Sequence, residues 1–166
     1  MVMPFEVVII GGGPGGATAA ILLARAGWSV AVVEKVPFPR RKVCGEYVSA
    51  TNLPLLDQMG ITETFQQLAG PEIRQVGIFA QDTILQADMP RPRENSSGWG
   101  RALGREHLDT LLLARAAEVG ATVLQPWSAT ALTRTGNGYV CRVSSKETAE
   151  ERDLEARVVI AAHGSW

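Results

Sequence analysis

The 166-residue sequence has little cysteine, almost no net charge and no long uninterrupted hydrophobic run. Its two cysteines, Cys44 and Cys141, are too few for a disulfide scaffold and fit a reducing compartment. The formal net charge of -1 offers no attraction for nucleic acid or an anionic membrane surface. The apolar N-terminus lacks a basic leader and is interrupted by glycines at 11–16, which argues against a signal peptide or transmembrane segment. We therefore expect a soluble, cytoplasmic protein that binds neither nucleic acid nor metal.

Residues 5–35 predict a strand, a glycine-rich turn, a helix and a second strand in direct succession. The first strand is the Val- and Ile-rich run 5–10, and the second is the apolar run 30–33. Between them, apolar residues recur at helical spacing until Gly27 ends the helix. A unit of this order around a glycine turn is typical of dinucleotide binding.

The glycines of the turn follow the pattern G-x-G-x-x-G, and each has a separate expected role. Gly11 permits the tight turn, Gly13 lets the backbone approach a pyrophosphate, and Gly16 lets the helix and the strand pack closely. The helix N-terminus adds N–H groups and a positive dipole end that attract phosphates. Glu34, which follows the second strand, can accept hydrogen bonds from an adenosine ribose. The alternative interpretation is a purely structural glycine turn in an α/β sheet.

The connection after the second strand, residues 36–50, is Pro-rich and basic, so we expect it to be irregular. A short helix over residues 53–59 should follow, with Ser49 or Thr51 as its cap and Gly60 behind it.

Farther along, the patterns predict a β-hairpin, a long helix, a single strand and a three-stranded β-meander. In chain order these are strands 73–79 and 83–89, a loop at 90–100, a helix at 105–119, and strands 121–124, 128–134, 139–145 and 154–162. We expect residues 158–162 to lie in the core. In the meander, Cys141 should serve packing only, on the strand face opposite to Val140 and Val143.

Five segments carry a family resemblance through their sequences and their order along the chain. They are GGGPGG at 11–16 with Glu34 after it, KVCGEYVSA at 42–50, REHLD at 105–109, GATVLQPWSA at 120–129 and RVVIAAHGSW at 157–166. Together they resemble the FAD-binding half of the glutathione-reductase-like superfamily, in the branch of geranylgeranyl reductases, aromatic-ring hydroxylases and flavin-dependent halogenases. In the last segment, His163 stands where the family has aspartate.

The resemblance implies FAD as the cofactor and assigns roles to individual residues. Those implied along the pyrophosphate and the adenosine ribose are Gly11, Gly13, Pro14, Gly15, Gly16, Glu34 and Lys35. Arg105 would reach the FAD phosphates or ribityl chain through fork-shaped, charge-assisted bonds, with a solvated helix-start arginine as the alternative. Ala129 would touch adenine through its backbone. Arg41 and Lys42 would approach phosphate or flavin, unless they belong to a solvated basic turn.

Cys44 is the candidate catalytic residue, because the family resemblance puts its segment beside the flavin. A thiol next to an isoalloxazine could support redox or acid–base chemistry, although no second cysteine stands at C-x-x-C spacing. The alternative role is to line the pocket.

The sequence therefore predicts an α/β protein, a Rossmann-like FAD-binding β-α-β unit with a three-stranded β-meander and a small inserted β segment. Residues 1–166 would form one FAD-binding domain, the N-terminal portion of a longer family member, with 70–100 starting an inserted substrate-domain segment. A C-terminal half or a homodimer partner would complete it.

The predicted function is a FAD-dependent oxidoreductase. Its flavin would pass hydride or electrons to a small organic substrate, as in reductases, or to oxygen, as in monooxygenases. NAD(P)H is one possible electron donor. The alternative is a non-catalytic nucleotide-binding fragment or a redox-sensing module.

Overall fold

A computed structural model of the chain describes residues 2–42, 46–90 and 98–164. Its central feature is a six-stranded sheet of order β7-β2-β1-β10-β9-β8. The sheet strands are β1 (Val2–Ile10), β2 (Val30–Val33), β7 (Thr122–Leu124), β8 (Trp127–Thr135), β9 (Gly138–Ser145) and β10 (Glu151–Ala161). The helices are α1 (Pro14–Arg25), α2 (Leu53–Met59), α3 (Thr62–Leu68) and α4 (Arg105–Glu118). This α/β architecture confirms the predicted fold class.

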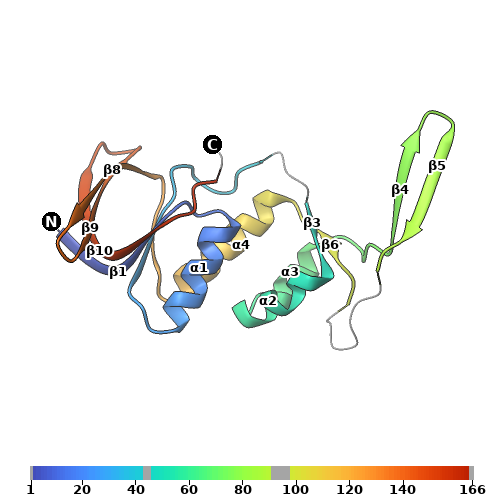
Figure 1. The fold of residues 1–166 in the computed structure, drawn as a ribbon, viewed down its shortest axis with the longest axis horizontal. Helices are drawn as coiled ribbons and strands as arrows, with labels where there is room; N and C mark the ends of the chain where they lie inside the picture. The colour runs from blue at the N-terminus through green and yellow to red at the C-terminus, as the bar shows by residue number, and fades with distance from the viewer. Residues whose placement is uncertain (1, 43–45, 91–97, 165–166) are drawn as a thin grey trace.

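The parallel part of the sheet forms because its Val- and Ile-rich runs are buried on both faces. Within β1, residues 7–10 pair with 30–33 of β2 on one side and with 158–161 of β10 on the other. Val7 and Ile9 point to the face that α1 and α4 cover, where the first hydrophobic core lies. The two helices lie side by side in Figure 1. This packing holds the N-termini of α1 and α4 near the carboxyl ends of β1 and β2.

The predicted meander is confirmed as β8, β9 and β10, and it belongs to the same sheet because β10 runs parallel to β1. The backbone N–H of Trp127, at the start of β8, donates to the carbonyl oxygen of Glu34, just after β2. The meander therefore curls back toward β2 and encloses a second hydrophobic core that includes Val8 and Leu154.

Two packing expectations for the meander are wrong. Cys141 and Val143 are buried together on one face of β9, because residues two apart in a strand point the same way, and Val140 lies on the other face. In the segment 158–162, Val158 and Ala161 are exposed and the other three residues are only partly buried. The reason is that β9 pairs with β10 only over residues 151–156, so β1 is the one strand neighbour beyond that point within the described chain.

Several short elements escape the sequence patterns. These are α3, a 3-10 turn at Ala50–Asn52, and the small two-stranded sheet of β3 (Tyr47–Val48) and β6 (Arg101–Ala102). The expected cap is also different, because Ser49 and Thr51 bond each other through their hydroxyls, at 2.7 Å, and Asn52 occupies the cap position of α2. Gly60 ends α2 in the left-handed conformation, as expected.

A separate hairpin of β4 (Gln75–Ala80) and β5 (Thr83–Asp88) projects away from the rest of the chain (Figure 1). It confirms the predicted strands and their turn at residues 81–82, and every residue in it is exposed. Cys44 and most of the predicted loop 90–100 lie outside the described residues. In the described part of the chain, no helix is both long enough and apolar enough to cross a membrane.

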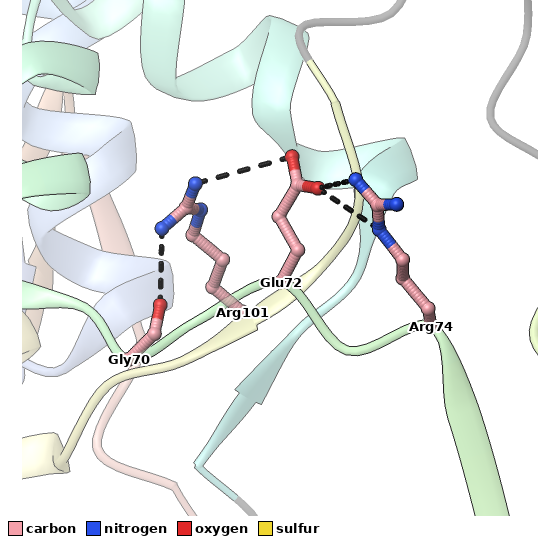
Figure 2. Close-up of polar contacts among 4 residues, drawn as sticks. All are labelled: Gly70, Glu72, Arg74 and Arg101. Carbon is pink, nitrogen blue, oxygen red and sulfur yellow. Dashed lines mark hydrogen bonds and ion pairs between the residues drawn. The ribbon is translucent and has the colours of Figure 1, made fainter.

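A cluster of charged side chains holds the base of the hairpin (Figure 2). Arg74 donates to one oxygen of Glu72 at 2.7 and 3.3 Å, and Arg101 lies 3.9 Å from the other oxygen. Arg101 also donates to the carbonyl of Gly70 at 3.1 Å. The hydrogen bonds from Arg74 lower the pKa of the Glu72 carboxyl, so this carboxylate stays ionised at neutral pH.

Candidate functional site

Two adjoining cavities lie where β1 and β2 end and α1 begins. Their volumes are about 470 and 420 Å³. They share the lining residues Gly11, Glu34, Arg40, Lys42 and His163. The larger cavity extends toward β8, and the smaller one extends across the glycine turn toward α4. Together they form one elongated site at the carboxyl edge of the parallel strands, the usual ligand position in such sheets.

Two glycines of the turn are required by the fold itself. Gly11 has φ +111°, and a Cβ on it would lie 2.5 Å from the carbonyl oxygen of Ala162. A Cβ on Gly16 would overlap the carbonyl oxygen of Gly11. These positions confirm the tight turn and the close helix–strand packing expected from the spacing.

Two other glycines are not required by the fold. A Cβ on Gly13 would have its nearest neighbour, Nη2 of Arg105, at 3.9 Å, and a Cβ on Gly15 would meet nothing within 4 Å. Both have ordinary backbone angles within or next to the first turn of α1, where N–H groups have no helical partner. The absence of side chains here keeps those N–H groups open to the smaller cavity, which both glycines line. This cradle suits an anion such as a phosphate.

Glu34 is buried and connects the glycine turn to the end of β2. Its Oε2 accepts from the N–H of Gly12 at 2.8 Å, and its Oε1 accepts from the N–H of Val36 at 3.0 Å. A carboxylate has about four acceptor positions, so both oxygens keep capacity for a further donor. Because Glu34 lines both cavities, that capacity is available where they meet. Its binding to ribose stays a prediction.

Arg105 opens α4 and is held by Asp109 one turn later. Its Nε and Nη2 donate to the two carboxylate oxygens at 2.7 and 2.9 Å. The side chains are 11% and 1% exposed, which contradicts the alternative of a solvated arginine. The pair forms because residues four apart share one helix face. No role was predicted for Asp109 beyond its place in the REHLD segment, although its four-residue spacing from Arg105 is a usable signal.

The basic residues of the irregular connection divide between two places. Arg40 and Lys42 line both cavities. The Arg40 guanidinium lies 5.1 Å from the Phe38 ring centroid, and its buried Nε has no hydrogen-bond partner among the described residues. Arg41, a residue expected at the cofactor, is instead 94% exposed and lies 4.0 Å from Glu106 in the first turn of α4. No local pattern distinguishes Arg40 from Arg41 in an irregular segment.

The larger cavity has an apolar floor and a polar rim. Ile10, Val33, Trp127 and Ala129 line it together with Lys35 and Ser128. Ala129 therefore lines a cavity, and its contact with adenine stays a prediction. Sequence reasoning missed Trp127. The exposed His163 lines both cavities. An apolar hollow beside a carboxylate, followed by an N–H cradle with arginines, matches the base, sugar and phosphates of a nucleotide.

Comparison with known proteins gives one family and several relatives. The family model described as "FAD binding domain" matches residues 4–166. Menaquinone reductase from Mycobacterium tuberculosis is 29% identical over 96% of this chain and 38% of the relative. Digeranylgeranylglycerophospholipid reductase 1 from Methanothermobacter thermautotrophicus is 32% identical over 99% of this chain and 40% of the relative.

Solved structures give the same picture. The crystal structure of a geranylgeranyl bacteriochlorophyll reductase-like protein from Thermoplasma acidophilum superposes with TM-score 0.81 and 26% identity, covering 99% of this chain and 40% of that one. A FAD-dependent halogenase and a flavin-dependent monooxygenase share the fold. The chain spans 38% of the length of the menaquinone reductase and 40% of the length of the digeranylgeranylglycerophospholipid reductase.

Proposed function

Since the chain belongs to the FAD binding domain family, we propose that it holds the adenosine diphosphate part of FAD along the two adjoining cavities, as the cofactor-binding part of a FAD-dependent oxidoreductase. One observation carries the proposal. The first turn of α1 is left bare by Gly13 and Gly15, which the fold does not need, and it faces an arginine fixed by a buried carboxylate.

Each part of the cofactor would bind the residues whose chemistry suits it. The pyrophosphate would bind the N–H groups of α1, with Arg105 and Arg40 as counter-charges. The ribose hydroxyls would donate to Glu34, and the adenine would lie on the apolar floor that includes Ala129. Lys42 and His163 line both cavities, so they would lie beside the ribose and the pyrophosphate, before the ribityl chain leaves toward the flavin ring.

The proposed reaction class is flavin-mediated electron transfer to a small organic substrate. Two relatives are named as reductases, which favours a reductase over an oxygenase. Bound FAD supplies the redox chemistry, and this chain supplies binding, orientation and electrostatics. NAD(P)H as donor and Cys44 as catalytic residue remain part of the proposal. The second candidate is a nucleotide-binding or redox-sensing module without turnover.

The direct test is to saturate the purified protein with FAD and pass it through gel filtration. Retained yellow flavin in the protein peak, and competition by ADP in calorimetry, would support the cofactor site. Reoxidation of the chemically reduced complex by an added quinone or alkene would favour the enzyme over the sensor. A protein that binds neither FAD nor ADP would contradict the proposal.

The two neighbouring arginines give a matched pair of variants. Arg40→Ala should weaken ADP binding about 10-fold, because one hydrogen bond to a charged group contributes about 1.5 kcal/mol. Arg41→Ala removes the same charge from an exposed side chain that lines neither cavity, and should change affinity less than about twofold. Isothermal titration calorimetry at one salt concentration would measure both. If both variants lose the same ADP affinity, the two arginines act on ADP only through long-range electrostatics and Arg40 makes no direct contact.

Glu34 should select a free ribose over a phosphorylated one. A 2′-phosphate would bring like charges together at the buried carboxylate, so we expect ADP-ribose to bind at least about 10-fold more tightly than its 2′-phosphorylated form. Glu34→Gln removes the charge at constant size and should reduce this ratio. The ratio is the useful quantity, since loosening the glycine turn would weaken both ligands alike. Equal binding of both ligands to the unaltered protein would disprove the role.

A further inference from the structure

Trp127 connects the larger cavity to a charged cluster on the meander. Its buried side chain belongs to the core that the meander encloses, and the residue lines the cavity with Ile10, Val33 and Ala129. Its N–H donates to the carbonyl of Glu34 at 2.8 Å, which ties its backbone to the junction of the two cavities. Trp127 therefore lies at the wall of the cavity in which the adenine is proposed to pack.

An arginine from another strand stacks on this indole. The guanidinium carbon of Arg152, in β10, lies 4.5 Å from the centroid of the Trp127 ring. Glu150 accepts from Nε and Nη2 of Arg152 at 2.8 and 3.1 Å, which fixes the plane of the guanidinium. This fork also raises the pKa of Arg152 and lowers that of Glu150, so both stay charged at neutral pH.

We propose that Arg152 is a positioning residue for base recognition, holding the Trp127 indole in place as a wall that favours a purine nucleotide in the larger cavity. The inference rests on the proposed nucleotide site and adds a residue that does not line it. Among aromatic rings, an indole makes the strongest cation–π contacts, and here the guanidinium restrains the ring of the first residue of β8. A purine has a larger contact area with a fixed flat wall than a pyrimidine has, so the wall should increase the affinity for purine nucleotides.

The chain supplies a matched control on the neighbouring strand. Arg142 of β9 makes the same kind of fork, to Asp153 at 2.9 and 3.1 Å, and stacks on no aromatic ring among the described residues. Arg152→Met and Arg142→Met therefore remove the same charge and the same type of ion pair from one strand pair. They differ in the contact with Trp127.

Calorimetry with three probes separates base recognition from general loosening. Arg152→Met should weaken ADP about 5-fold, as expected for one cation–π contact, and should weaken inorganic pyrophosphate less than about twofold. The preference for ADP over UDP should fall by a similar factor. Arg142→Met should leave all three affinities within about twofold. In a Trp127→Leu background, Arg152→Met should have no further effect on ADP, because its action passes through the indole.

The outcomes separate failure of the Arg152 positioning role from failure of the proposed nucleotide site. If the unaltered protein binds no ADP, the proposed function fails and this inference fails with it. If ADP binds but Arg152→Met matches Arg142→Met, or weakens ADP and pyrophosphate equally, the positioning role is overturned and the nucleotide site stands. An additive effect in the Trp127→Leu background would equally overturn it.

Discussion

Gly13→Val should abolish binding of ADP and FAD while leaving the fold intact. The unaltered backbone at Gly13 has φ -69°, which valine adopts freely, and the nearest protein atom to an added Cβ is 3.9 Å away. The new side chain would instead fill the space in front of the α1 N-terminus, where a phosphate would lie. We expect at least about 100-fold weaker binding, or roughly 2.7 kcal/mol. Calorimetry measures the binding, and circular dichroism with urea unfolding measures the fold.

Gly16→Ala is the informative contrast, because this change should destabilise the fold itself. Its methyl group would overlap the carbonyl oxygen of Gly11, so the helix and the strand must separate. We expect a loss of stability of about 2 kcal/mol from overpacking. A Gly13→Val protein that binds ADP normally would place the phosphates elsewhere. A Gly13→Val protein that unfolds would show that the fold does need this glycine.

Asp109→Ala should be among the most destabilising single changes in the chain. It leaves the guanidinium of Arg105 without its buried carboxylate partner in a site where the two side chains are 11% and 1% exposed. Removing one member of a buried pair costs about 3 kcal/mol. Arg105 also loses the two hydrogen bonds to Asp109 that orient its guanidinium, so ADP affinity should fall in the protein that remains folded. Urea unfolding gives the first quantity, and calorimetry below the transition gives the second.

Glu118→Ala supplies the control on the same helix. Glu118 is 63% exposed and pairs with Arg115 at 3.0 Å, three residues earlier in α4. An exposed pair of this kind contributes less than about 0.5 kcal/mol, and ADP affinity should not change. If the two variants lose similar stability, burial is not what gives the Arg105–Asp109 pair its strength.

Some elements follow from the sequence because their signals are local. Residues 30–33 were predicted as a strand with the observed bounds, and the β8–β9–β10 meander and helix α4 were predicted within a few residues. The signals were apolar runs, helical spacing and glycine turns, which act over a few neighbouring residues. The strictest glycines, Gly11 and Gly16, were also identified by spacing alone, because their requirement comes from one turn and the helix that follows it.

Other features depend on which segments meet. The partial exposure of residues 158–162 follows from where β9 stops pairing, which no apolar run encodes. Arg40, rather than Arg41, reaches the cavities because the irregular connection turns one side chain inward and the next outward. Trp127 lies beside Glu34 because the meander curls back over the sheet.

By itself, the sequence determined a dinucleotide-type β-α-β unit, a meander and the part of the site that the glycine turn carries. Those parts depend on backbone conformation and on contacts between close neighbours in the chain. Tertiary structure alone decided the burial of the Arg105–Asp109 pair and the stacking of Arg152 on Trp127. Burial depends on the layers that α1 and α4 form with the sheet, and stacking depends on strands brought together by pairing. The spacing of residues along the chain therefore predicts neither feature.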